Sequence, residues 1–103
     1  MAQYIIIYLG SDTPPPADFD PQASKAKWGQ WLQGLGDAVV NRGTPMMHSK
    51  IVSPDEVADA GKKGSTGFTI VEADSMDAAT EMAKGCPYLE MGNLEVAELM
   101  QMG

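Results

Sequence analysis

The sequence predicts a single α+β domain in which four strands and two helices follow the order β-α-β-β-α-β. Short runs of β-branched and aromatic residues recur along the chain and end at glycines or polar residues, which is typical of strands. Between them, apolar residues recur at helical spacing behind capping residues. The 103 residues are 44% hydrophobic and 20% charged, a balance that suits one globular domain over residues 1–103.

The first predicted element is a buried strand over residues 3–9, QYIIIYL, which ends at Gly10. Strand alternation places its side chains on two faces. One face carries Tyr4, Ile6 and Tyr8, and the other carries Ile5, Ile7 and Leu9. A loop follows to Asp20, and the three consecutive prolines at residues 14–16 favour a stiff connector over a proline ligand for a partner.

The second element is a helix that begins near Asp20 and Pro21. An aspartate can cap the first backbone N–H groups, and proline suits the first helical position. The apolar residues then fall on one stripe at i, i+3, i+4 and i+7, namely Trp28, Trp31, Leu32 and Leu35. Gly34 and Gly36 are expected to end the helix.

The middle of the chain gives a weaker pattern. Residues 39–40 suggest a strand, residues 41–45 a bend or bulge that ends at a proline, and residues 46–52 a second strand. The proline cannot donate a hydrogen bond to a sheet, so an edge or a turn is expected there. Residues 53–67 are predicted to be a polar loop, in which residues 54–56 could form a short helical turn.

The last three elements are a strand, a helix and a strand. Residues 67–73, GFTIVEA, form the strand, and Asp74 or Ser75 caps the helix after it. The apolar side of this helix consists of Met76, Ala79 and Ala83. Gly85 is expected to stop the helix, and residues 93–100 form the final strand.

Right-handed crossovers between these elements predict one arrangement of the sheet. Two β-α-β units give a four-stranded antiparallel sheet with both helices on one face, the ferredoxin-like arrangement. The strands carry apolar residues on both sides, yet no further element is predicted to cover the second face. A homodimer closed over the open sheet faces is therefore expected.

Charge and composition exclude several classes of partner. The net charge of −7 disfavours nucleic acid and anionic membranes, because both are themselves negative. The single cysteine, Cys86, excludes an internal disulfide and a multi-thiolate metal site, and it is expected to be structural and unreactive. No cofactor and no metal are predicted. The first apolar run is too short to cross a bilayer or to form a signal core, so a cytoplasmic location is expected.

Several segments resemble the YCII-related family. Residues 67–79, GFTIVEADSMDAA, together with residues 84–87, KGCP, and residues 92–96, GNLEV, are similar to the C-terminal half of these proteins. The first strand, the tryptophan helix and residues 43–45 are consistent with the N-terminal half. The resemblance implies a dimeric α+β barrel with a cleft between the helices, the sheet and the partner subunit.

The active-site patterns of that family do not carry over to this chain. Some members are thought to use a His–Asp pair with the histidine on the first helix, but residues 22–35 contain no histidine. The positions there hold Lys25, Lys27 and Trp28. The Asp-Gly-Pro-Phe motif of another branch is also missing, since residues 64–68 read GSTGF.

Two residues are candidate general bases. His48 is the only histidine, and its ordinary pKa of about 6.5 would let it shuttle protons at neutral pH, although it could equally be a plain surface or strand histidine. Glu95 stands between the apolar Leu94 and Val96. A position inside a barrel would desolvate its carboxylate and raise its pKa, whereas a position at an edge would leave it in water.

Four residues are candidate ligand-binding residues. Tyr4 and Tyr8 share a strand face and could orient a carbonyl or phenolic ligand if that face is the open one, or pack in a dimer core. Trp28 belongs to the helix stripe, either as core or as a ligand platform. Arg42 could pair with an acidic ligand, although its neighbours also suit a plain turn.

Two functions from different classes follow. The first is a small-molecule-binding dimer without catalysis, which the missing first-helix histidine favours. The alternative is a cofactor-independent enzyme that acts on a small carbonyl or phenolic compound by proton abstraction, lyase or oxygenase chemistry. In that case His48 or Glu95 would be the base, and Tyr8 would orient the substrate.

Overall fold

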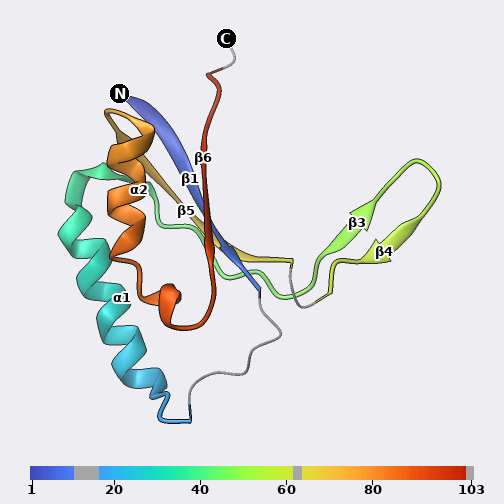
Figure 1. The fold of residues 1–103 in the computed structure, drawn as a ribbon, viewed down its shortest axis with the longest axis horizontal. Coiled ribbons are helices and arrows are strands. Elements are labelled where there is room, and N and C mark those ends of the chain that lie inside the picture. Colours follow the sequence, from blue (N-terminus) through green and yellow to red (C-terminus); the bar gives the residue numbers. More distant parts are fainter. Residues whose placement is uncertain (11–16, 62–63, 102–103) are drawn as a thin grey trace.

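The computed structural model describes residues 1–10, 17–61 and 64–101, and Figure 1 shows how its elements are arranged. The helices are α1 (Pro21–Leu35) and α2 (Met76–Lys84), with the short 3-10 helices η1 (Gly36–Ala38) and η2 (Pro87–Glu90). The strands are β1 (Ala2–Leu9), β2 (Val39–Asn41), β3 (Lys50–Val52), β4 (Val57–Asp59), β5 (Ser65–Ala73) and β6 (Leu94–Glu98). The prolines at residues 14–16 lie outside the described residues.

Four strands form one antiparallel sheet in the order β2-β5-β1-β6. The central pair, β1 and β5, runs in register over almost its whole length. Side chains from both α helices pack on the same residues of this pair, so the helices cover one face of the sheet (Figure 1). The predicted ferredoxin-like α+β arrangement is confirmed.

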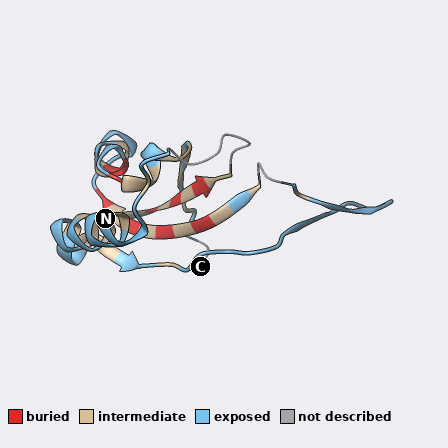
Figure 2. Cartoon of the chain, turned by 90° about the horizontal axis from the view of Figure 1, so that it is seen from below, coloured by how far each residue is buried: buried red, intermediate tan, exposed pale blue. Residues whose placement is uncertain are grey.

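The hydrophobic core lies between the two central strands and the helices. Buried and partly exposed residues alternate along both strands, as the red and tan bands of Figure 2 show. In β1 the buried residues are Tyr4, Ile6 and Tyr8. Ile6 and Val71 are fully buried, and removing each side chain from water contributes about 1.5–3 kcal/mol. The tyrosine face of β1 is therefore the face under the helices.

Both α helices begin at a side-chain cap that the sequence predicts. The carboxylate of Asp20 accepts the backbone N–H of Gln22 at 3.0 Å. Of the two candidates for α2, the cap is Ser75 and not Asp74, because the Ser75 hydroxyl accepts the backbone N–H of Ala78 at 3.1 Å. Each cap satisfies a backbone donor that the helix itself leaves free.

The middle of the chain differs from the prediction. Residues 46–49 do not join a strand, and β3 and β4 form a separate two-stranded hairpin, residues 50–59, which we name the hairpin arm. The predicted loop at 53–67 thus contains β4 and the start of β5, and residues 54–55 form a bend and not a helical turn. Strands of three residues carry too little periodicity to be distinguished from a polar loop.

Two smaller expectations at the C-terminal side are also wrong. Met76 was expected on the apolar side of α2, but it is 40% exposed, whereas Ala79 and Ala83 are buried. Met76 is the first residue of α2, so its side chain lies at the end of the helix, where solvent reaches it. The final strand spans Leu94–Glu98 and is shorter than predicted.

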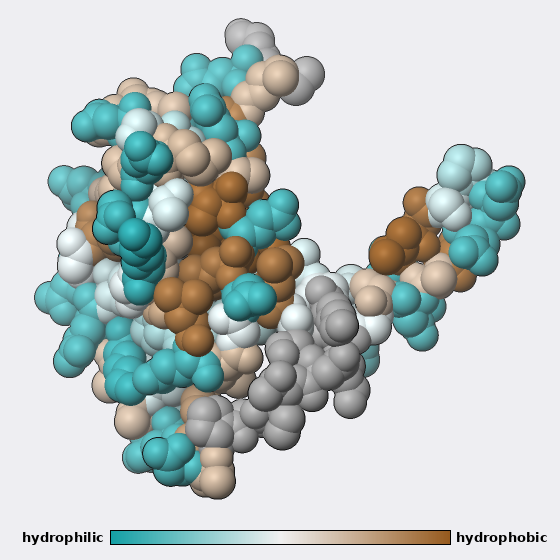
Figure 3. Space-filling view, viewed as in Figure 1, coloured by the Kyte–Doolittle hydropathy of each residue, from teal (hydrophilic) through white to brown (hydrophobic). Residues whose placement is uncertain are grey.

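The second face of the sheet and the hairpin arm remain uncovered in the single chain. The pairing of the strands places Ile5, Ile7, Phe68, Ile70, Glu95 and Ala97 together on this open face. Figures 1 and 2 show the arm projecting away from the helices and the sheet. Figure 3 shows hydrophobic surface gathered around β6 and again on the arm. Among the described residues, neither helix has the length and apolar character to cross a membrane.

Candidate functional site

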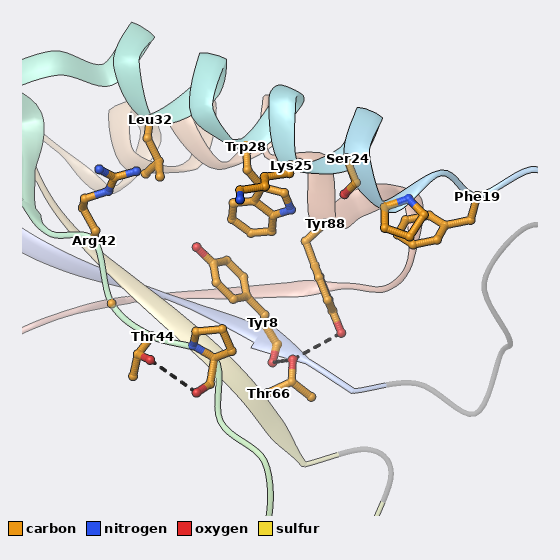
Figure 4. A pocket seen from close by; sticks show the side chains of 13 residues that line it. Tyr8, Phe19, Ser24, Lys25, Trp28, Leu32, Arg42, Thr44, Thr66 and Tyr88 are labelled. Atoms are coloured by element: carbon orange, nitrogen blue, oxygen red, sulfur yellow. Dashed lines mark hydrogen bonds between the residues drawn. The ribbon is translucent and has the colours of Figure 1, made fainter.

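A pocket of ≈ 460 Å³ opens between α1 and the end of β1. Its walls are mostly apolar and aromatic, which is typical of small-molecule sites. The lining residues come from α1 and the turn before it, from β1, from the segment after β2, from the start of β5 and from η2 (Figure 4). They are Tyr8, Phe19, Pro21, Ser24, Lys25, Trp28, Leu32, Arg42, Gly43, Thr44, Pro45, Thr66 and Tyr88.

The centre of the pocket is a cluster of aromatic rings. The ring centroids of Tyr8 and Trp28 lie 5.1 Å apart at an interplanar angle of 77°, an edge-to-face contact. Tyr8 and Tyr88 lie 5.4 Å apart at 34°. Trp28 in turn contacts Trp31 edge-to-face at 5.6 Å. Such contacts stabilise by about 0.5–1.5 kcal/mol each beyond the burial of area, so the cluster fixes the shape of the wall.

Hydrogen bonds hold the Tyr8 side chain in place. The Thr69 hydroxyl donates to the backbone oxygen of Arg42 at 3.0 Å, so the Tyr8 hydroxyl donates to Thr69 in their mutual hydrogen bond. Burial raises the pKa of Tyr8 to about 12, against the opposing effect of the Thr69 hydrogen bond. Tyr8 is therefore a neutral phenol at physiological pH.

A second phenol, that of Tyr88 in η2, forms another part of the pocket wall. The Tyr88 hydroxyl donates to the backbone oxygen of Leu9 at 2.8 Å, which ties η2 to the end of β1. The Thr66 hydroxyl lies 3.0 Å from the backbone oxygen of Tyr8 and 3.4 Å from the Tyr88 hydroxyl. These bonds join three segments that are far apart in the sequence, so the pocket is formed before any ligand enters.

Two cationic side chains lie at the pocket. Lys25 projects from α1 beside Trp28, and the guanidinium of Arg42 lies beside Leu32 (Figure 4). Both residues are exposed. The ion pairs between described residues involve Lys27, Lys50 and Lys84, and none of them involves Lys25 or Arg42.

The structure brings three of the predicted site residues together and places three others elsewhere. Tyr8, Trp28 and Arg42 line the pocket. Tyr4 is 3% exposed in the core and does not line it. His48 is exposed in the segment that leads to the hairpin arm, and Glu95 is exposed on the open sheet face opposite Ile7.

Sequence reasoning missed Tyr88, Thr66 and Lys25 as pocket residues. Tyr88 follows the end of α2 by four residues, in a turn without periodicity, so nothing in the sequence indicates that it reaches back to β1. Thr66 was assigned to a loop that turns out to belong to β5. Lys25 stands one turn before Trp28 on α1, and that spacing was the available signal.

Cys86 lies outside the pocket and is 3% exposed. Burial raises the pKa of its thiol to about 11, while the backbone N–H of Tyr88 acts in the opposite direction. Desolvation, and not the nearby end of α2, is thus the main cause of its low reactivity. Across residues 1–10, 17–61 and 64–101, no group of three or more His, Cys, Asp or Glu side chains could hold a metal ion.

Comparison with known proteins shows similar solved structures and a family. A search of curated proteins found no match. The fold is similar to that of a 5-chloro-2-hydroxyhydroquinone dehydrochlorinase from Burkholderia phenoliruptrix, solved in complex with 2,5-dihydroxybenzoquinone. The two are 16% identical over 97% of this chain and 95% of that chain, with a TM-score of 0.56, so the likeness shows the fold alone. The family model of the YCII-related domain matches residues 20–103, and because this is most of the chain, the protein belongs to the YCII-related family.

Proposed function

We propose that this protein binds a small organic molecule in the aromatic pocket and works as a homodimer. The observation that carries the proposal is a preformed concavity of ≈ 460 Å³ whose rings are held by hydrogen bonds. Pockets of about 300–1,000 Å³ with apolar walls and a few polar groups are typical of small-molecule sites. A wall that is already ordered lowers the entropic cost of binding.

The comparisons support a ligand of this kind. The dehydrochlorinase of similar fold was solved with a small quinone, and the present chain has an aromatic pocket of suitable size for a molecule of that class. The sequence identity is low, so the ligand of that enzyme is a guide to size and shape only.

The homodimer is part of the same proposal. The open sheet face carries apolar side chains from three neighbouring strands, among them Ile7, Phe68 and Ile70. An isolated two-stranded hairpin is only marginally stable in water, and every strand residue of the hairpin arm is exposed. A second copy would cover both surfaces and would close a cleft over the sheet. We also propose a cytoplasmic setting, in which a single free thiol stays reduced.

The alternative, a cofactor-independent enzyme, requires a base near the substrate. His48 and Glu95 do not line the pocket of their own chain. This alternative therefore requires the partner subunit to bring one of these side chains to the pocket, and catalytic turnover that survives in a monomeric variant would contradict it.

Tryptophan fluorescence tests where the ligand binds, because Trp28 lines the pocket and Trp31 does not. We expect some aromatic or polyketide-like compounds to raise the Tm in a thermal shift screen. A compound that does so should quench the fluorescence of wild type and of Trp31→Phe, and should lose most of this quenching in Trp28→Phe.

Trp31→Phe is the matched control because it keeps the pocket wall and removes only a neighbouring indole, whose N–H donates to the backbone oxygen of Met82 at 2.9 Å. A screen in which no class of compound raises the Tm would contradict the proposed function. So would quenching that depends on Trp31 and not on Trp28.

A further inference from the structure

The charge at the pocket is opposite to the charge of the protein. The chain holds 14 acidic and 7 basic residues, yet the described residues that line the pocket include Lys25 and Arg42 and no Asp or Glu. The ion pairs between described residues leave both cations unpaired, whereas Lys27, two residues along α1, is paired with Glu90 at 2.9 Å. A cationic pocket in an acidic protein concentrates anions at this place.

The hydrogen-bonding groups of the pocket also favour an anionic ligand. The hydrogen of the Tyr8 hydroxyl is donated to Thr69, and that of the Tyr88 hydroxyl is donated to Leu9. Neither phenol therefore keeps a donor for a ligand. Among the described residues, the side chains that keep donors are the ammonium of Lys25, the guanidinium of Arg42, the hydroxyl of Ser24 and the indole N–H of Trp28. A ligand that suits this set offers acceptor oxygens and a negative charge.

The part of the pocket wall between the two cations, formed by Tyr8 and Trp28, suits a flat ring. Trp28 and Tyr8 meet edge-to-face, so an incoming ring finds both a ring face and a ring edge to pack against. Figure 4 shows Lys25 beside Trp28 and Arg42 beside Leu32, with the Tyr8 ring between the two groups and the sheet. A ring seated on Tyr8 would have a cation on the helix side and another on the side of the β2 segment.

We propose that the ligand of this pocket is a planar aromatic anion, a ring that carries a carboxylate or an ionised hydroxyl, and that Lys25 and Arg42 bind its charge. This inference rests on the proposed function and narrows it to one chemical class. Tyr8 is neutral at physiological pH and so does not repel the anion. A neutral aromatic molecule or a non-aromatic anion would use only half of the site.

Calorimetric titration of the full-length protein with four probes tests the inference. 2-Naphthoate supplies a ring and a carboxylate, 2,4-dinitrophenolate a ring and an ionised hydroxyl, 2-naphthamide a neutral ring, and cyclohexanecarboxylate an anion without an aromatic ring. We expect at least one aromatic anion to bind, with 2-naphthamide and cyclohexanecarboxylate each about tenfold weaker or more, since a charged hydrogen bond accounts for about this factor. Comparing the two aromatic anions separates the carboxylate from the phenolate.

Three glutamine variants assign the charge to its residues. Lys25→Gln and Arg42→Gln should each lower the affinity for the aromatic anion about tenfold and leave the affinity for 2-naphthamide unchanged. Lys27→Gln is the matched control on the same helix, because Lys27 does not line the pocket, and it should bind like wild type. Equal Tm values for all four proteins would show that the pocket remains folded.

The outcomes separate this inference from the proposed function. If 2-naphthamide bound as tightly as 2-naphthoate and neither cation variant changed the affinity, the ligand would not need a negative charge. That result would overturn the inference but leave the pocket as a binding site. If cyclohexanecarboxylate bound as tightly as 2-naphthoate, the ligand would not need an aromatic ring, and the inference would be wrong in that part. Failure of every aromatic probe to bind would overturn the inference, whereas the proposed function would be overturned only if no compound of the thermal shift screen raised the Tm either.

Discussion

Gly43 is the residue on which the floor of the pocket depends. Its φ of 76° lies in the left-handed region, its N–H donates to the Asn41 side chain at 2.8 Å, and a Cβ added there would overlap the backbone oxygen of Phe68. Gly43→Ala should therefore displace the segment that carries Arg42 and lower the free energy of unfolding by about 2 kcal/mol or more, measured by urea denaturation.

Gly29→Ala is the matched control for this change. Gly29 lies within α1, and a Cβ added there meets no atom within 4 Å. Alanine in a helix interior is favoured over glycine by about 0.5–1 kcal/mol, so this variant should be slightly more stable than wild type. If Gly43→Ala were as stable as Gly29→Ala, the close approach to β5 would be disproved.

Because of Cys86, the free energy of unfolding is expected to fall at alkaline pH. Burial raises the pKa of its thiol from 9.0 to about 11, so the unfolded chain releases the proton first as the pH rises. The stabilisation by the neutral thiol is complete below pH 9 and is lost as the pH rises through about 11. The loss amounts to roughly 2 kcal/mol.

The comparison that isolates the thiol is the difference in unfolding free energy between wild type and Cys86→Ala. This difference should shrink between pH 8 and pH 11, and the ionisation of Tyr8 cancels from it because both proteins contain that phenol. A difference that stays constant over this range would mean that the thiol is not desolvated in the folded protein.

At the scale of the elements, the sequence was sufficient where local signals and tertiary packing agree. The first helix has a capping aspartate, a periodic apolar stripe and a terminal glycine, and α1 begins and ends where these signals place it. The central strands were predictable for the same reason, since their alternation matches the two faces of the sheet. Which of those faces meets the helices did not follow, because both are apolar.

The hairpin arm and half of the pocket could not be predicted from local signals in the sequence. Strands of three residues with every side chain exposed leave no pattern of burial to read. Tyr8, Trp28 and Arg42 could be selected one by one as polar or aromatic residues, but their meeting with Tyr88 depends on the hydrogen bond from its hydroxyl to the oxygen of Leu9, 79 positions earlier. Contacts of this separation follow from the topology and not from local composition.

At the scale of the whole molecule, the shape of the single chain is too open for its size. The radius of gyration is 14.9 Å, whereas a compact domain of about 100 residues has about 13 Å. The excess comes from the hairpin arm, which stands away from the body with Val52 75% exposed and Ile51 61% exposed. The arm and the open sheet face are the two surfaces that a second copy would cover.

Light scattering after size exclusion should give a mass of twice the 11.0 kDa of one chain. Ile5→Lys places a charge in the middle of the open face, between the apolar Ile70 and Ala97 of the neighbouring strands. Burying an unpaired ammonium in the interface costs several kcal/mol, while the same lysine is solvated in the monomer, so the variant should be a folded monomer. Met76→Lys, at an exposed position of α2, should stay dimeric, and a monomeric wild type would contradict the homodimer outright.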